Sequence, residues 1–360
     1  MEVLKFIFAV FAVLGAADKI FGSKFKIGEE FEKGILAAGT LSFAMVGMLC
    51  VAPALAGWLS PVFEPFSKLT GIDLSFIGAF IANDMGGAAI AMELTKASAV
   101  GGLNGLVVAS MMGATICFTV PVALKMIKKE YHKEVLSGIL CGIATMPVGC
   151  IVSGLMLKIP FGQLLLNLSP VLVMAVVTCI GLILVPEICS KIFAGIGWAV
   201  SAVITVGLAA GIFKHITGIE VIKNMMPVMD AFEIVCDIAI ILSGVFPLIF
   251  VISKVFGKVF SLLGKKLGIN ETAVLGIVSS LANSIPTINM ADKMDKKGRM
   301  LNMAFAVSAS FVFGDHLAFT MAFDESFVGA VIAGKLISGV AAFIVADIVF
   351  RLTEKKENKA

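Results

Sequence analysis

The stretch Ile81-Ala-Asn-Asp-Met-Gly-Gly87 interrupts an otherwise apolar segment with an amide, a carboxylate and two glycines. About 200 residues later, Leu281-Ala-Asn-Ser-Ile-Pro-Thr287 interrupts a second apolar segment in the same manner. In a bilayer, a broken helix is tolerated only where protein buries it or where it lines a wet cavity. An ionisable side chain such as Asp84 is costly at that depth and therefore indicates a functional site. The two stretches predict two broken helices that face each other within a membrane protein.

The composition agrees with a membrane protein, because 59% of the 360 residues are hydrophobic and only 15% are charged. A soluble domain carries about 25% charged residues, so we expect an all-α polytopic fold. Eleven apolar segments follow one another, most of them long enough to cross a hydrocarbon core of ~30 Å. They cover roughly residues 3–17, 35–59, 72–95, 100–127, 134–157, 165–186, 190–212, 230–253, 270–290, 300–323 and 326–350.

The distribution of Lys and Arg predicts the topology, since cytoplasmic loops carry an excess of them. If the interrupted segments 72–95 and 270–290 each enter and leave on one side, 21 of these residues fall on one side and 6 on the other. Eleven full spans would give a weaker split of 16 to 11. We therefore expect nine spanning helices and two re-entrant segments, with the N-terminus outside and the C-terminus cytoplasmic. Basic stretches at 60–70 and 254–267 are predicted to be amphipathic helices in the membrane interface.

An internal repeat relates residues 30–157 to residues 229–350 within a single transporter domain of residues 1–360. At an offset of 200, Ala82-Asn83 matches Ala282-Asn283 and Ser110 matches Ser310. Five predicted crossings separate the copies, so they should be inverted, as in many secondary transporters. Chance similarity between Ala- and Val-rich helices is the alternative interpretation.

The first interruption carries the sharpest candidate for binding. Asp84 lies beside backbone freed by two glycines, and its carboxylate can attract a small cation and accept hydrogen bonds from it. The alternative is an ion pair with Lys335, which lies inside the last apolar segment. Asn83 and Asn283 can bind substrate or satisfy the broken backbone, and the residues leave both roles open.

The second interruption contributes hydroxyl groups around Pro286, which removes a backbone donor and forces the chain to break. Ser284 and Thr287 flank this proline, and such hydroxyls cap a half-helix more often than they contact a ligand.

The tenth segment adds Asp315 and His316, which would point about 100° apart on a regular helix. His316 can act as a proton relay or substrate acceptor because it titrates in the physiological range, or it can be a satisfied core histidine. Thr320 follows one turn later as a hydroxyl partner, and Thr115 occupies the position of His316 in the first repeat.

No other chemistry is suggested by the residue pattern. The seven cysteines are scattered through apolar segments without a metal-ligand spacing. We expect no metal, no cofactor and no nucleic-acid surface, and we expect no enzyme, because there is no clustered catalytic set.

Several motifs resemble those of the ethanolamine-utilisation membrane protein family, the EutH-type ethanolamine permeases. They run along nearly the whole chain, and the most specific is the last: Asp84-Met-Gly-Gly87, Met112-Gly-Ala-Thr-Ile116, Met146-Pro-Val-Gly-Cys150, Ala282-Asn-Ser-Ile-Pro286, Asp292-Lys-Met-Asp-Lys-Lys-Gly298 and Gly314-Asp-His-Leu-Ala-Phe-Thr320. The resemblance implies a multi-pass permease of the bacterial cytoplasmic membrane that imports ethanolamine for catabolism.

Protonated ethanolamine fits the candidate residues. Its ammonium suits Asp84, and its hydroxyl suits Asn283, Ser284 or His316. We expect a facilitator or secondary transporter, with access alternating as one repeat rocks against the other. An ion-coupled transporter of another small amine or of a nucleoside is the alternative, followed by a membrane enzyme acting on amino-alcohol headgroups and by a scaffold or sensor. The sequence leaves the coupling mode and the oligomeric state open.

Overall fold

The computed structural model describes residues 2–81 and 85–357, and every regular element in these ranges is a helix. The expected all-α fold is therefore confirmed. Seven helical stretches of the described part are long and apolar enough to cross a membrane. They are Ile27–Thr70, Ser98–Met126, Lys129–Met156, Phe161–Leu184, Pro186–Thr217, Val228–Val255 and Asp315–Lys355. The count of nine spans stays a prediction.

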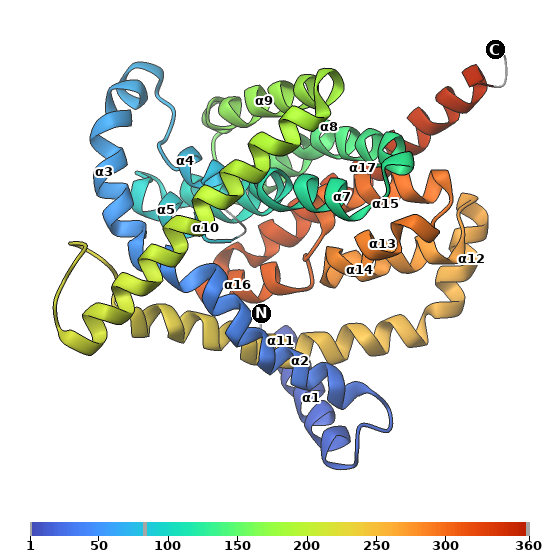
Figure 1. Ribbon diagram of the computed structural model, residues 1–360, viewed down its shortest axis with the longest axis horizontal. Coiled ribbons are helices and arrows are strands. Elements are labelled where there is room, and N and C mark those ends of the chain that lie inside the picture. The colour runs from blue at the N-terminus through green and yellow to red at the C-terminus, as the bar shows by residue number, and fades with distance from the viewer. Residues whose placement is uncertain (1, 82–84, 358–360) are drawn as a thin grey trace.

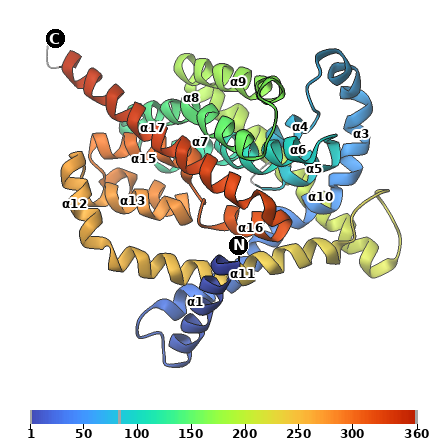
Figure 2. The ribbon, with the colours of Figure 1, turned by 180° about the vertical axis from the view of Figure 1, so that it is seen from behind.

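The helix α11 (Val228–Val255) runs along one edge of the molecule, and α1 (Glu2–Ile20) and α2 (Ile27–Leu41) pack against it as a pair that extends beyond it (Figures 1 and 2). Small residues permit this packing. A Cβ added to Gly34 would lie 2.4 Å from the Cα of Ser243. Glycines at such contacts let helix backbones approach closely in membranes.

The second apolar segment is longer than predicted. The helix α2 continues through the π-helical turn η1 (Ser42–Val46) into α3 (Gly47–Thr70) without interruption. Residues 60–70, predicted to form a separate amphipathic helix, are instead the end of α3, because the helical backbone continues through the prolines of this stretch. The long helix α10 (Pro186–Thr217) crosses η1 and α3 where a Cβ on Gly47 would lie 1.7 Å from the Ile204 carbonyl oxygen.

A second group of helices consists of α8 (His132–Met156), α15 (Lys296–Ala309) and α17 (Val328–Glu357), which pack on one another. The end of α17 projects away from the body in both views (Figures 1 and 2). Against α8 lies α9 (Phe161–Leu184).

Both interrupted segments fold back on themselves, and the ends of the first meet. Its described parts are α4 (Phe76–Phe80) and α5 (Gly87–Leu94). A Cβ on Gly78 would lie 2.8 Å from the Cβ of Ala91, so the two short helices lie side by side. Beyond them, the Lys96 backbone N–H donates to the Asp73 carboxylate at 3.0 Å.

The second interrupted segment consists of α13 (Glu271–Ala282) and α14 (Ser284–Met290). The Thr287 hydroxyl donates to the Gly276 carbonyl at 2.7 Å. The two residues are 11 apart in sequence, which in a straight helix would place them about 16 Å apart, so the chain must fold back between them. At the base, the Asn270 side chain donates to the Lys293 carbonyl at 2.9 Å. A helix of 12 residues such as α13 is about 18 Å long, too short to cross the hydrocarbon core.

The bases of the two hairpins lie near opposite ends of α8. The first base reaches the second turn of α9, the helix that follows α8, where the Asp73 N–H donates to Asn167 at 2.7 Å. The second base contacts the start of α8 through Arg299, whose guanidinium is 3.6 Å from Glu134. With 25 residues, α8 is about 37 Å long, comparable to the thickness of a membrane.

The remaining described elements connect these parts. The stretch 98–126 is one continuous helical run with two π-helical sections, η2 and η3. The predicted helix at 254–267 exists as the separate α12. These elements are α6 (Ser98–Gly102), η2 (Leu103–Gly113), η3 (Thr115–Thr119), α7 (Val120–Met126), η4 (Lys129–Tyr131), α12 (Gly257–Leu267), η5 (Ala291–Lys293), α16 (Asp315–Asp324) and η6 (Glu325–Phe327).

Candidate functional site

The second hairpin breaks at Asn283, as the sequence predicts. This residue has an extended backbone, with φ −158° and ψ 131°, between α13 and α14. Its side-chain oxygen accepts a hydrogen bond from the Ile285 N–H at 2.8 Å, so it caps α14. Of the two roles left open for Asn283, the structure shows the backbone-satisfying one. Thr287 also bonds backbone, whereas the Ser284 hydroxyl is buried and has no hydrogen-bond partner among the described residues.

A further break, which the sequence analysis did not predict, divides the tenth segment. The helix α15 ends at Ala309, and α16 begins only at Asp315. Between them Phe311 has a positive φ of 62°, which is uncommon for a residue with a side chain. The prediction of one continuous helix over residues 300–323 is therefore wrong.

This break is bound to the second hairpin by backbone hydrogen bonds. The Phe311 N–H donates to the Ser280 carbonyl at 2.9 Å, and the Phe313 N–H donates to the Leu281 carbonyl at 2.8 Å. A Cβ on Gly314 would lie 2.0 Å from the Ala282 carbonyl oxygen, so only glycine fits at this contact. Two helix interruptions thus meet at one buried place, and each satisfies part of the other's backbone.

His316 and Thr320 lie just beyond this junction, on α16. The His316 side chain is 1% exposed, and its ring centroid is 5.0 Å from that of Phe311. The Thr320 hydroxyl donates to the His316 carbonyl at 2.7 Å, and a bond between Thr320 and the imidazole stays a prediction. Asp315 is the first residue of α16 rather than a mid-helix residue. Asp315 and His316, which were predicted to point about 100° apart on a regular helix, are therefore the first two residues of α16.

Thr115 reaches the same region from η3, which lies in the predicted first repeat. It is fully buried at the start of η3, and its hydroxyl donates to the Met111 carbonyl at 2.7 Å. The same oxygen is 3.4 Å from the carbonyl of Val307 on α15. Thr115 is therefore brought to the end of α15, next to the break.

Two hydroxyls that the sequence analysis missed also lie at the end of α15. The hydroxyls of Ser308 and Ser310 are buried, and the described residues offer neither a hydrogen-bond partner. The available signal was the predicted repeat, in which Ser310 matches Ser110. With Ser284, they leave three buried hydroxyls able to donate and accept hydrogen bonds.

The first interruption contains two of the candidate residues. Asn83 and Asp84 lie outside the described residues. Lys335, the alternative partner of Asp84, is fully buried on α17, and its ammonium donates to the Ser110 carbonyl at 2.9 Å. Whether Lys335 and Asp84 form an ion pair stays a prediction.

A cavity of about 360 Å³ opens beside the second break. One wall comes from the hairpin and includes Asn283, and the opposite wall comes from α11 and includes Phe246 and Phe250. Glu30 and Lys33 of α2 complete the lining. Their side chains form an ion pair at 2.6 Å. The cavity therefore extends from charged groups on α2 to the amide at the break.

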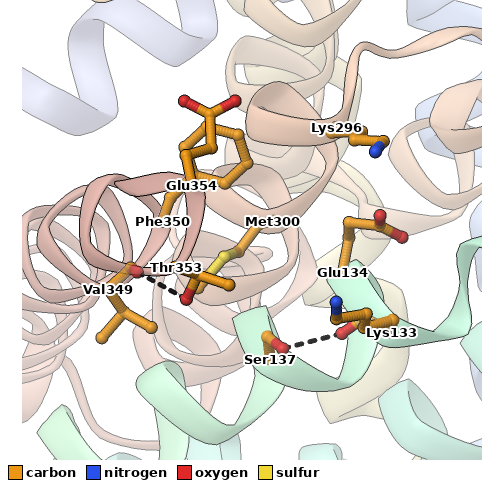
Figure 3. Close-up of a pocket in the computed structure, with 9 residues that line it drawn as sticks. All are labelled: Lys133, Glu134, Ser137, Lys296, Met300, Val349, Phe350, Thr353 and Glu354. Atoms are coloured by element: carbon orange, nitrogen blue, oxygen red, sulfur yellow. Dashed lines mark hydrogen bonds between the residues drawn. The ribbon is translucent and has the colours of Figure 1, made fainter. Parts of the chain in front are cut away.

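A smaller pocket of about 150 Å³ lies away from the break, between α8, α15 and α17 (Figure 3). Lys296 and Glu134 lie on one side of it and Glu354 on the other (Figure 3). Its charges are mixed, and Ser284, Ser308 and Ser310 are not among the residues that line it.

Comparison with known proteins relates the chain to one family. A family model described as "Ethanolamine utilisation protein, EutH" matches residues 1–349. A Listeria monocytogenes protein named "Probable ethanolamine permease EutH" is 44% identical over 360 residues, covering 100% of this chain and 96% of the relative. Proteins of the same name from Salmonella typhimurium and Escherichia coli are 37% and 36% identical, each covering 96% of this chain and 94% of the relative. No solved structure matches the chain.

Proposed function

Because this chain belongs to the EutH family of ethanolamine utilisation proteins, we propose that it is a permease that imports ethanolamine into the cytoplasm. With several helices able to span a bilayer, the chain is a multi-pass cell membrane protein, and three of its relatives are named as probable ethanolamine permeases. The observation that carries the proposal is the buried junction of two helix breaks, where polar groups collect inside an apolar protein. Broken helices near the midplane form the substrate sites of many secondary transporters.

Ethanolamine offers two groups for the proposed site to bind. The ammonium of ethanolamine has three N–H donors, for which we propose Asp84, with Asn83 beside it. The hydroxyl can donate and accept, as can the buried hydroxyls of Ser284 and Ser310. The remaining candidates are Asn283, Asp315, His316, Thr115 and Thr320. The hydroxyls of Thr115 and Thr320 already donate to carbonyls, so they retain only acceptor capacity for a substrate.

We propose that both hairpins are re-entrant and that residues 30–157 and 229–350 are inverted repeats. The support is that each hairpin closes on itself by hydrogen bonds at its base and that the bases lie near opposite ends of α8. Parts assigned to the cytoplasmic side also contact each other: Lys297, at the start of α15, forms a 2.7 Å ion pair with Asp347 of α17, near the C-terminal tail. The N-terminus would then lie outside.

The cavity between α11 and the second hairpin gives the proposed site a route to one side of the membrane. Its wall contains Phe246 and Phe250, whose ring faces attract an organic ammonium. The Lys254 ammonium already lies 4.6 Å from the centroid of the Phe250 ring, so this ring accepts such a contact. In the proposed topology the cavity opens toward the cytoplasm.

The test is uptake of labelled ethanolamine by purified protein in liposomes, with unlabelled compounds as competitors. We expect uptake above that of protein-free liposomes and competition by unlabelled ethanolamine. Uptake of another small amine or of a nucleoside, with no competition by ethanolamine, would establish the alternative substrate. Protein-free rates for all of these compounds would contradict the permease function.

A further inference from the structure

Lys335 is an unusual residue for its position. It lies about two turns into α17 and is 0% exposed, although lysine is almost never fully buried. A buried ammonium inside a membrane protein is costly, and such residues are retained for function. Its Nζ donates to the Ser110 carbonyl oxygen at 2.9 Å, which ties α17 to η2.

The helix that carries Lys335 is held firmly in place. The Ser338 hydroxyl donates to the Met146 carbonyl at 2.9 Å, and the Ser153 hydroxyl donates to the Ala330 carbonyl at 2.7 Å. Between these bonds, a Cβ on Gly149 would lie 2.0 Å from the Gly334 carbonyl oxygen. The base of the lysine side chain is thus fixed, while its four-carbon stem can still change conformation.

The acceptor of Lys335 belongs to the region proposed to bind substrate. Ser110 precedes Thr115 by about one turn of the π-helical stretch, and Thr115 approaches α15 beside the break. On α17, one turn beyond Lys335, a Cβ on Gly339 would lie 2.6 Å from the Cβ of Ala309, the last residue of α15. The lysine therefore extends into the space where η2, α15 and α17 meet.

A lysine side chain ends in the same chemical group as the substrate, a CH₂ that carries an ammonium. We infer that Lys335 is a tethered counterpart of the substrate ammonium, which occupies buried acceptors in the unloaded permease and withdraws when a primary amine binds. The inference rests on the proposed function. Its physical reason is that unsatisfied buried acceptors destabilise a protein. With Lys335 in place, the unloaded protein can change its access from one side of the membrane to the other at little cost.

This role predicts a difference between two modes of transport. Net uptake requires the unloaded protein to reorient, whereas exchange of labelled for unlabelled ethanolamine requires only the loaded protein to do so. In Lys335→Met, a neutral variant of similar length, we expect net uptake to fall by about tenfold or more while exchange stays within about threefold of wild type, since each tenfold corresponds to ~1.4 kcal/mol. Ser338→Ala, which removes a hydrogen bond between α17 and α8 but no charge, should leave both modes near wild type.

Wild-type protein provides a measurement that does not depend on how the variants fold. If Lys335 replaces the substrate, net uptake by wild type should be about as fast as exchange. Exchange much faster than net uptake in wild type would overturn the inference. So would a folded Lys335→Met that keeps net uptake or loses both modes. If wild-type protein transports ethanolamine in neither mode, the proposed function itself fails.

Discussion

At the scale of single residues, the described part of the junction is fixed by close backbone contacts. Gly314 is the clearest example, because its α-carbon lies against the Ala282 carbonyl and leaves no space for a methyl group. Asn283 is another, since its side chain caps the helix that follows the break. Both residues are needed because the two interruptions must supply hydrogen bonds that a continuous helix would form internally.

A substitution at Gly314 tests this contact. Gly314→Ala should destabilise the protein by roughly 1–3 kcal/mol, because the added methyl group would displace backbone rather than a flexible side chain. Thermal unfolding in detergent should show a lowered midpoint. Gly195→Ala on α10 is the matched control, because nothing lies within 4 Å of a Cβ at that position. Equal midpoints for Gly314→Ala and wild type would contradict the contact.

At the scale of elements, the sequence predicted the helices better than their interruptions. Apolar runs located most helices, and Asn283 with Pro286 located the break in the second hairpin. The break at residues 310–314 was missed because it is satisfied by hydrogen bonds to α13, which are distant along the chain. Its local signal is a short β-branched and aromatic stretch before Gly314, which has low helix propensity. The sequence analysis also missed the continuity of α3. Proline usually ends or kinks a helix, but α3 contains three prolines and stays helical through all of them.

The hairpin geometry predicts which ends of the interrupted segments are accessible together. Single cysteines at Lys68 and Lys96, both exposed, should react with a membrane-impermeant maleimide from outside the cell. Cysteines at Lys266 and Lys293, also exposed, should react only after the membrane is opened. A background without native cysteines is required, since Cys236 is exposed. Opposite accessibility of Lys68 and Lys96 would contradict a re-entrant first segment.

The turn between α1 and α2 depends on the ionisation of Asp18. Burial alone would raise the pKa of this carboxyl, but backbone N–H groups of Gly28 and Phe25 donate to it and hold its pKa below the usual value. A lowered folded-state pKa means that Asp18 contributes stability above the unfolded-state pKa of about 3.9 and loses it as the pH falls through the lower value.

Unfolding of Asp18→Asn tests this account. The variant should unfold at a lower temperature than wild type near pH 7, because an amide oxygen is a weaker acceptor than a carboxylate. The difference should shrink as the pH falls below about 4. A difference that is constant from pH 7 to pH 3 would show that the charge of Asp18 does not stabilise the turn.

At the scale of the whole molecule, two groups of helices surround the proposed site. In the first group, α1, α2, α3 and α11 lie along the lower and left edges in Figure 1, and α10 crosses the molecule diagonally. The group of α8, α15 and α17 holds the second hairpin. The cavity between α11 and that hairpin lies where these groups meet. The proposed alternating access would correspond to movement of one group against the other, which would open and close this route.

The central claim is that the broken segments form the site for the substrate ammonium, with Asp84 as its carboxylate. The most direct test is uptake of labelled ethanolamine into proteoliposomes by wild type and Asp84→Asn from pH 5 to pH 8. Low pH is decisive because the uncharged amine crosses lipid unaided, whereas the ammonium does not. The account predicts uptake by wild type at pH 5 and none by a folded, inserted Asp84→Asn. Equal uptake by both proteins would contradict it.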